Sequence, residues 1–349
     1  MGTSDTLPTP APNRARPSGR APTLHDIAAL AGVSIRTVSR VVNDGPGPAA
    51  ATRARVLEVI DHLGYRPNLM ARGLVTRQSF ALGLVATYLV DPFFAELARG
   101  IQEAGERHGY LVYLTSSEGD PAKQERVIQS LVDRGCDGLI VFPVRGSQNQ
   151  LCAIADRGVP VVTIDYAIDH PRIGSVESAT ERGAQIAVEH LRSQGRNQLG
   201  MISSPSSETV DEPREHGFRE AIAGNGAADP RHHVVWADET VEGGAEGVRR
   251  LLDRFPDLDG VLAYNDIMAI GAMRALEDVG RRVPDDVAVV GVDDVAVSAL
   301  VRPALTTIRL DREQMGARAV DMLMRMRAEP SLSPGRETVD VSLVVRSSA

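Results

Sequence analysis

The sequence is poor in the residues and segments that build redox sites, metal sites and membrane anchors. Only two cysteines, Cys136 and Cys152, occur among the 349 residues, and they form no CxxC pair. No apolar run approaches the ~20 residues that a membrane-spanning helix requires. The first 22 residues are rich in Pro, Ser, Thr and Arg and lack the apolar core of a signal peptide. These absences predict a cytoplasmic protein with two inert, reduced thiols and a disordered tail over residues 1–22.

The sequence motifs of common enzymes are also missing. The single lysine, Lys123, belongs to no G-x-x-x-x-G-K-[ST] phosphate loop, and no G-x-G-x-x-G, G-x-S-x-G or HExxH motif occurs. His232 and His233 are adjacent in a polar stretch, without the spacing of a metal site. We therefore expect no catalytic residues, no metal and no cofactor. An enzyme with a doubly wound parallel sheet remains the alternative function, since many enzymes have such sheets.

Charge is distributed unevenly along the chain. The formal net charge is -8, but residues 1–77 contain ten arginines, no lysine and only five acidic residues, so this segment carries +5. The remainder therefore carries −13. A basic segment attached to an acidic body indicates that the front end binds a polyanion, whereas the body has another task. On charge alone, a solvated basic tail without a partner is an equal alternative.

Three short helices are predicted after the tail. Thr23 and Asp26 have the spacing of a capping box, and Gly32 ends the first helix. Ser34 can cap a second helix, and a third is expected from about Thr52 to Leu63. The predicted apolar stripes are Leu24, Ile27, Ala28, Leu30 and Ala31 in the first helix, Val38, Val41 and Val42 in the second, and Val56, Val59, Ile60 and Leu63 in the third. This order is typical of a helix-turn-helix domain.

Burial of the valines would leave a polar face on the second helix. Ile35, Arg36 and Arg40 would then point outward, where an arginine fork suits guanine and an aliphatic side chain suits a thymine methyl group. Short polar side chains beside them suit phosphate oxygens. The alternative is a solvated helix face in a small helical bundle.

The stretch "TLHDIAALAGVSIRTVSRVVND" and the following "TRARVLEVIDHLGYRPNLMARGL" resemble the DNA-binding headpiece of LacI-family bacterial transcription regulators. The resemblance extends from about Thr23 to the C-terminus. It implies base contacts by Ile35, Arg36 and Arg40. It also implies phosphate contacts by Thr23, Leu24, Ser34, Thr37, Ser39, Asn43 and Thr52.

The stretch "RPNLMARGL" matches the family's hinge, which folds into a short helix in the minor groove. The resemblance assigns Asn68, Ala71 and Leu74 to this contact, with Leu74 as the wedge that unstacks the central base step. An ordinary buried hinge leucine is the alternative for Leu74. One departure lies upstream: Pro48 and Ala49 stand where family members usually have Val-Ser. The cap of the third helix could therefore shift to Thr52, or Pro48 could pre-set the entry to the helix.

Beyond Gln78, buried apolar runs alternate with helical stretches in two successive series. This pattern predicts two doubly wound parallel-sheet subdomains, and the resemblance implies an architecture like that of periplasmic sugar-binding proteins. The expected divisions are a headpiece over 23–67, a hinge over 68–78 and an effector-binding and dimerisation domain over 79–349. The first subdomain is expected to comprise about 79–177 plus 309–328, and the second about 178–308 plus 329–345.

Ligands of such sheets bind beyond the carboxyl ends of the strands, where several polar residues occur. The resemblance assigns effector contacts to Phe93, Asp165, Arg214, Asn265 and Asp293. Asp266 and Asp294 are expected to cap helices or loops, and Phe94 to lie in the core.

The sequence departs from the family in "WADETVEGG": if the register is fixed on Gly244, Glu239 occupies the position of a stacking aromatic. Trp236 could replace that aromatic only if the register slips. A sugar or related polyol or nucleoside is the expected effector, and an acidic residue also suits an amine-bearing ligand.

The resemblance implies a regulator that binds a near-palindromic double-stranded operator as a homodimer and responds to a small molecule in the cleft. Only "RSSA" follows the last apolar strand, so no heptad tail for tetramers is expected. Repression is expected over activation, and the effector could either release or tighten DNA binding. An extracytoplasmic binding protein would share the cleft but would have no use for residues 23–76.

Overall fold

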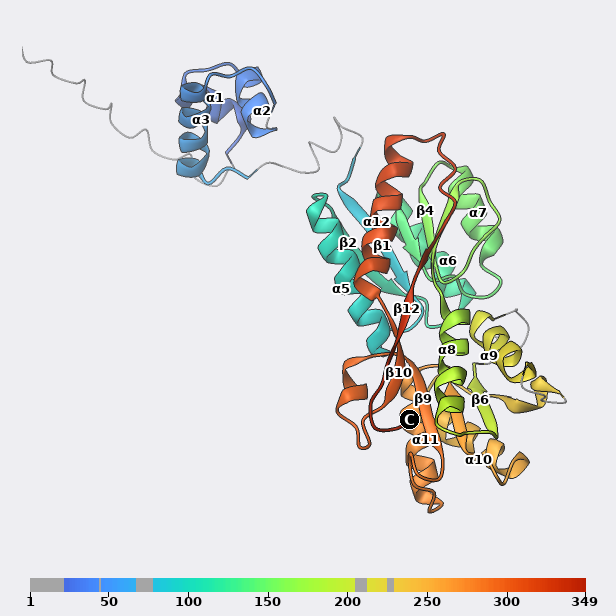
Figure 1. The fold of residues 1–349 in the computed structure, drawn as a ribbon. Coiled ribbons are helices and arrows are strands. Elements are labelled where there is room, and N and C mark those ends of the chain that lie inside the picture. The colour runs from blue at the N-terminus through green and yellow to red at the C-terminus, as the bar shows by residue number, and fades with distance from the viewer. Residues whose placement is uncertain (1–21, 44, 67–77, 205–211, 225–228) are drawn as a thin grey trace, which may run out of the picture. The chain divides into compact units, whose positions relative to one another are not determined.

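The computed structural model describes residues 22–43, 45–66, 78–204, 212–224 and 229–349. The chain divides into two units, residues 1–77 and residues 78–349, which are described separately (Figure 1). The hinge residues Asn68, Ala71 and Leu74 lie outside the described residues, as does the predicted tail apart from residue 22.

The first unit contains three helices: α1 (Leu24–Ala31), α2 (Ile35–Val42) and α3 (Ala50–Leu63). The capping box of α1 forms as predicted, because the Thr23 hydroxyl accepts from the Asp26 amide and the Asp26 carboxylate accepts from the Thr23 amide. Gly32 ends α1 at φ +64°, a conformation that favours glycine. The Ser34 hydroxyl accepts from the Thr37 amide and caps α2.

Two details of this unit differ from the prediction. Leu30 is 62% exposed, because its side chain points about 110° away from the centre of the stripe formed by the buried Ile27, Ala28 and Ala31. The third helix begins at Ala50, and Ala49 caps it without a side-chain hydrogen bond, so the cap does not shift to Thr52.

The second unit contains two six-stranded sheets flanked by helices. The first sheet is entirely parallel, in the order β11 (Arg336–Val339), β5 (Ile173–Ser178), β4 (Val161–Ile164), β3 (Leu139–Val141), β1 (Ala81–Ala86) and β2 (Leu111–Ser116). The second has the order β12 (Val341–Val344), β10 (Thr306–Leu310), β9 (Ala288–Asp293), β8 (Gly260–Ala263), β6 (Leu199–Ser203) and β7 (Val234–Trp236), with β12 antiparallel to β10.

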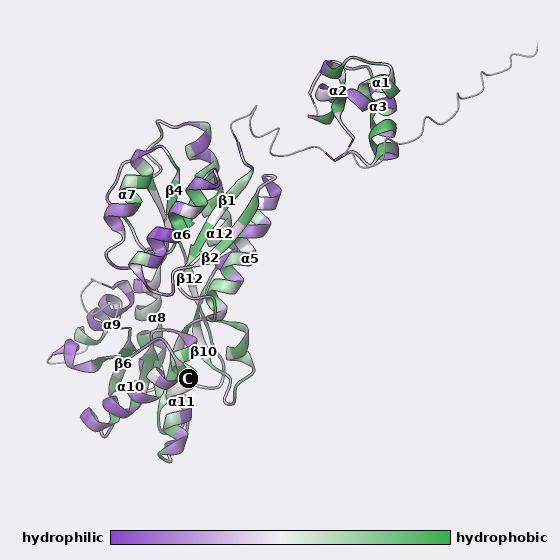
Figure 2. Cartoon of the chain, turned by 180° about the vertical axis from the view of Figure 1, so that it is seen from behind, coloured by the Kyte–Doolittle hydropathy of each residue, from purple (hydrophilic) through white to green (hydrophobic). Residues whose placement is uncertain are grey.

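Helices cover these sheets and connect their strands. The first sheet is associated with α5 (Pro92–Arg107), α6 (Pro121–Asp133), α7 (Gln148–Asp156) and α12 (Arg312–Ala328), and the second with α8 (Thr180–Ser193), α9 (Pro213–Ala223), α10 (Val241–Arg254) and α11 (Asp266–Asp278). Figure 2 shows apolar strands between helices that carry polar residues on part of their surface. The two sheets thus confirm the predicted pair of doubly wound subdomains.

The end of the chain differs from the expected division between the subdomains. Residues 329–345 were expected in the second subdomain, but β11 pairs with β5 of the first sheet, and only β12 joins the second. The physical reason is that α12 packs against α5 and β5, so the chain leaving α12 returns to the edge of the same sheet. The chain crosses between the subdomains after β5, after β10 and between β11 and β12.

Candidate functional site

The outward face of α2 is the first candidate site. Val38 and Val41 are buried, whereas Arg36 and Arg40 are exposed and Ile35 is 38% exposed. This alternation follows from helical geometry, because the valines occupy one stripe that packs against α1 and α3. The three predicted base-contacting side chains are therefore accessible on one short helix.

Most of the predicted phosphate contacts have local partners in the headpiece. Thr23 and Ser34 cap helices, and the Ser34 and Thr37 hydroxyls lie 2.8 Å apart. The Asn43 amide donates to the Ser39 carbonyl at 2.9 Å. Leu24 packs against the headpiece core, and Thr52 is half-buried in the first turn of α3.

The second candidate site is a cavity of about 360 Å³ between the two sheets of the second unit. Its walls are the loops that follow the carboxyl ends of the parallel strands, the position at which such folds bind ligands. All five predicted effector residues line it: Phe93, Asp165, Arg214, Asn265 and Asp293.

Three phenylalanines form the apolar part of the cavity. The Phe94 ring lies edge-to-face with Phe93 and with Phe142, at centroid distances of 5.3 and 4.8 Å. Phe93 is buried in the core, whereas Phe94 is half-buried and also lines the cavity. The expected packing of Phe94 against the core is confirmed. Phe94 is partly exposed because it faces the space between the sheets.

Arg214, the second residue of α9, is the buried cation of the cavity. Its guanidinium donates to the Tyr264 carbonyl at 2.8 Å and lies over the Tyr264 ring at 4.2 Å. Its Nε is 3.8 Å from the Glu212 carboxylate and has no hydrogen-bond partner among the described residues. Burial alone would lower the pKa of Arg214, but the surrounding groups, Tyr264 and Glu212 first, raise it above its ordinary value. Arg214 therefore stays charged, with a donor left for a ligand.

Two strand-end aspartates have left-handed backbone conformations. Asp165 follows β4 with φ 51°, and Asp293 ends β9 with φ 115°. Such conformations cost about 1–3 kcal/mol for residues with a side chain and persist where the surroundings enforce them. The Asp165 carboxylate accepts from the Ser178 amide at 2.6 Å. The strain therefore occurs at residues predicted to bind the effector.

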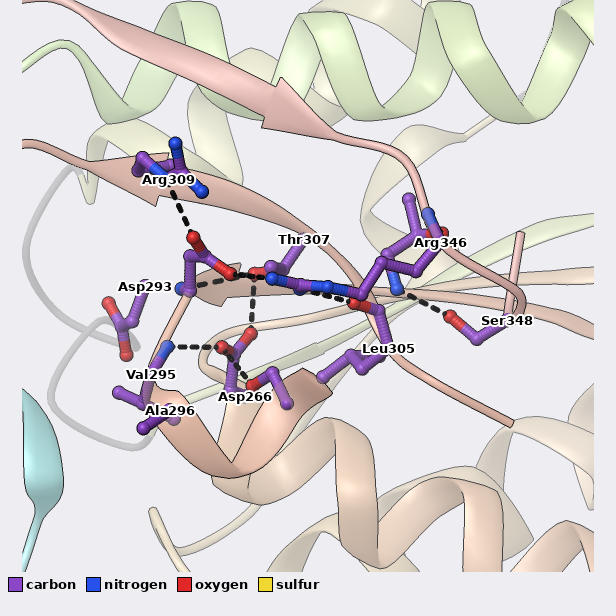
Figure 3. A network of polar contacts seen from close by, with 12 residues as sticks. Asp266, Asp293, Val295, Ala296, Leu305, Thr307, Arg309, Arg346 and Ser348 are labelled. Carbon is purple, nitrogen blue, oxygen red and sulfur yellow. Dashed lines mark hydrogen bonds and ion pairs between the residues drawn. The ribbon is translucent and has the colours of Figure 1, made fainter. Parts of the chain in front are cut away.

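A polar network supports the loop that follows Asp293 (Figure 3). The buried Asp266 carboxylate accepts from the Val295 amide, the Ser298 hydroxyl and the Thr307 hydroxyl, at 3.0, 2.6 and 2.5 Å. Asp266 thus stabilises this loop, as expected for a capping residue.

Asp294 and Arg312 extend this support. The Asp294 carboxylate forms ion pairs with Arg309 at 2.7 Å and Arg346 at 2.5 Å. Arg312 donates to the carbonyls of Asp293 and Asp294 and pairs with Glu96 of α5 at 2.8 Å. Arg312 therefore connects the Asp293 loop of the second subdomain to the first subdomain.

Glu239 lines the cavity, and Trp236 does not. The Trp236 indole donates to the Glu215 carboxylate at 3.1 Å, so it does not replace the missing aromatic. The Glu239 carboxylate accepts from the Ser204 hydroxyl at 2.6 Å. Glu239 therefore occupies the cavity wall, and its correspondence to the family's aromatic position stays a prediction.

Several cavity residues were not singled out by sequence reasoning. Asp91 caps α5 by accepting from the Phe93 amide at 2.9 Å, and Tyr264 precedes Asn265 after β8. Tyr264 stands directly after a strand, which was an available signal for its position, whereas Asp91 lies in the longer loop between β1 and α5. Other lining residues that were missed include Tyr88, Phe142, Tyr166, Glu177 and Glu212.

Burial perturbs the ionisation of the cavity carboxyl groups. Desolvation raises the pKa values of five of them above their ordinary range: Asp91, Asp165, Glu212, Glu239 and Asp293. Hydrogen bonds and Arg214 oppose this effect only in part. The cavity therefore disfavours additional negative charge.

A helix-turn-helix headpiece joined to two doubly wound subdomains with a ligand-sized cavity is the architecture of a ligand-responsive DNA-binding regulator. Residues 23–68 match the family "Bacterial regulatory proteins, lacI family", and residues 79–343 match "Periplasmic binding proteins and sugar binding domain of LacI family". The chain belongs to the LacI family, and its relatives are transcriptional repressors rather than enzymes. No helix of the described residues is long and apolar enough to cross a membrane.

Individual relatives cover nearly the whole chain. The ribose operon repressor of Escherichia coli (strain K12) is 31% identical over 94% of this chain and 99% of its own length. The repressor PurR of Photobacterium profundum is 31% identical over 86% of this chain and 91% of its own.

Solved structures are similar over the same extent. The Lac repressor dimer bound to operator and the anti-inducer ONPF is 29% identical with a TM-score of 0.83, over 94% of this chain and 99% of that one. The regulator CelR in complex with cellobiose is 31% identical with a TM-score of 0.72, over 94% and 100% of the two chains.

Proposed function

We propose that this chain is a homodimeric repressor that binds a near-palindromic operator and is controlled by a small polyhydroxylated metabolite in the cavity. The observation that carries the proposal is the exposure of Ile35, Arg36 and Arg40 on a helix whose opposite face is buried. In this proposal Ile35 contacts a thymine methyl group, and the two arginines bind guanine edges in the major groove. The protein acts in the cytoplasm, where its DNA is.

Phosphate binding is assigned to the first turns of the headpiece helices. Thr23 and Ser34 cap helix N-termini, which attract anions through unpaired amides and the helix dipole, and Thr37 lies in the first turn of α2. Leu24, Ser39, Asn43 and Thr52 complete the proposed set. The hinge contacts of Asn68, Ala71 and Leu74 remain part of the proposal.

Two features support a homodimer and an effector site. β2 is an edge strand on which Leu111 and Tyr113 are 59% and 44% exposed, a surface suited to a second copy.

In the cavity, Asp165, Asn265 and Asp293 offer groups that bind hydroxyls, and Arg214 can bridge two of them. Phe93 and Phe94 cover an apolar ring face. The Lac repressor structure, a dimer with operator, and the CelR complex, with a disaccharide, support both assignments by analogy.

The test of DNA recognition is the variant Arg36→Ala. An operator is first selected from random double-stranded DNA with the full-length protein, and binding to it and to single-base variants is then titrated by gel shift. Loss of a bidentate guanine contact should cost about 1–3 kcal/mol and abolish the preference at one base pair of each half-site.

Arg55→Ala is the control, because Arg55 is exposed on α3 and should leave base discrimination intact. Unchanged discrimination in the Arg36 variant would remove α2 from the recognition surface.

A further inference from the structure

The charge of the cavity is unbalanced. Six carboxylates line it: Asp91, Asp165, Glu177, Glu212, Glu239 and Asp293. The only cations among the described lining residues are the buried Arg214 and Arg145, and Arg145 is exposed. A neutral polyol would leave this excess of carboxylates over cations uncompensated, and burying carboxylates without a cation is costly.

One buried polar atom of the cavity lacks a hydrogen-bond partner within the described part of the chain. The Arg214 Nε has no acceptor among the described residues. The Asp293 carboxylate also lines the cavity, and this residue is only 5% exposed. Since native proteins satisfy almost all buried polar groups, the Arg214 Nε indicates a ligand that brings its own acceptor, and Asp293 offers an acceptor for that ligand's donors.

The acidic excess is concentrated where the two subdomains face each other. Asp91 lies in the loop between β1 and α5 of the first subdomain, and Glu239 follows β7 of the second. Burial raises the pKa of Glu239; the Ser204 hydrogen bond and Arg214 oppose this shift, and Asp91 and the neighbouring Asp238 add to it. Burial and then Glu239 raise the pKa of Tyr88. Asp91 and Glu239 each have one neutral hydrogen-bond donor, the Phe93 amide and the Ser204 hydroxyl. Neither carboxylate has an ion pair with a described cation.

We infer that the effector is cationic, an amino sugar or a similarly aminated polyol, whose ammonium group binds between Asp91 and Glu239 while its hydroxyls contact Arg214, Asn265 and Asp293. This inference rests on the proposed function, since it assigns a chemical class to the effector of that site. An ammonium group between Asp91 and Glu239 connects the two subdomains, so occupancy favours their closed arrangement. Sugar phosphates, uronic acids and nucleotides are excluded, because their negative charge would add to the excess.

The experiment compares three 2-amino hexoses with their hydroxyl counterparts. The pairs are D-glucosamine with D-glucose, D-galactosamine with D-galactose, and D-mannosamine with D-mannose. Binding of each sugar to the full-length protein is measured by calorimetry at pH 7. At least one amino sugar should bind ten-fold or more tightly than its counterpart. Glu239→Gln should remove most of this preference, and Asp91→Asn provides a second, independent variant.

The control is Glu103→Gln, because Glu103 is partly exposed on α5 and pairs only with Arg99 among the described residues. It should keep the full preference. The inference is overturned if a neutral sugar binds as tightly as its amino counterpart, if no amino sugar binds, or if both cavity variants keep the preference.

Operator binding is measured in parallel, because it distinguishes a failure of the effector's charge assignment from a failure of the proposed function. A neutral sugar that binds and changes operator affinity leaves the proposed function standing and overturns only the charge assignment. A protein that binds no operator DNA fails the proposed function itself.

Discussion

At the scale of single residues, the buried Asp266 carboxylate supports the loop beside the cavity. Asp266 accepts three hydrogen bonds from the loop after β9 and from β10, and this loop holds Asp293 in its left-handed conformation. Burial raises the pKa of Asp266 to about 6, and its hydrogen bonds with Ser298 and Thr307 oppose the shift only in part. Support of the ligand-facing residue is thus coupled to an ionisation within the physiological range.

The raised pKa of Asp266 predicts a pH-dependent stability. The folded state binds the Asp266 proton more tightly than the unfolded state, so this contribution is fully present below pH ~4 and is lost as the pH rises through about 6. Wild type should therefore lose stability relative to Asp266→Asn between pH 4 and 7, as measured by urea unfolding.

Asp286→Asn is the control for this prediction. The Asp286 pKa is lowered to about 2 by hydrogen bonds from Arg282, so its contribution is present above pH ~4 and changes only below the tested range. A stability difference between wild type and the Asp266 variant that does not change with pH would contradict the assignment.

At the same scale, the sequence could predict those cavity residues that stand directly after apolar strands. Asp165, Asn265 and Asp293 are recognisable in this way, and Arg214 through the family pattern. Tyr264 and Glu212 could not be assigned, because their roles depend on contacts with Arg214 that only the fold creates. Likewise, the acidic side chains of Asp91 and Glu239 line the same cavity only because two loops that are distant in the sequence meet in the fold.

At the scale of elements, glycines allow α10 and α11 to approach closely. A Cβ atom at Gly244 of α10 would lie 2.0 Å from the Met268 carbonyl, and one at Gly271 of α11 would lie 1.9 Å from the Val241 carbonyl. Since both contacts are with backbone, a side chain cannot be accommodated by a rotamer change. The pair of helices supports the loops that present Glu239 and Asn265.

Gly271→Ala should therefore destabilise the protein by about 1–3 kcal/mol or more, because the helices must separate. Gly224→Ala is the matched control: its φ is −57° and the nearest atom to a new Cβ is 3.7 Å away, so stability should be unchanged or slightly higher. Urea unfolding measures both. Equal stabilities of the two variants would contradict the close packing.

Elements with strong apolar periodicity were predictable, and polar strands were not. β5 (IGSVES), β10 (TTIRL) and β11 (RETV) were not identified as strands, because their polar side chains mask the pattern. β5 is buried through pairing with β4 and β11, which depends on tertiary structure. The position of β11 in the first sheet therefore could not be inferred from the order of elements.

At the scale of the whole molecule, the proposed regulation requires communication between the cavity and the DNA-binding headpiece. Three chain crossings connect the subdomains, and Arg312 links Glu96 of the first to the Asp293 loop of the second. A ligand that contacts both subdomains can thus change their relative arrangement, and in the proposed dimer this change would alter operator affinity. Typical coupling energies correspond to roughly 5–150-fold changes in affinity.

The most direct test of this claim is the operator dissociation constant with and without effector, for wild type and Arg214→Ala. The effector is first identified by thermal shift against sugars, amino sugars and nucleosides, where about 100 times its dissociation constant should add ~2.7 kcal/mol of stability. Wild type should show a change in operator affinity of at least about five-fold. Arg214→Ala should bind operator normally without responding, while Arg249→Ala, exposed on α10, responds as wild type does. A normal effector response in the Arg214 variant would contradict the account.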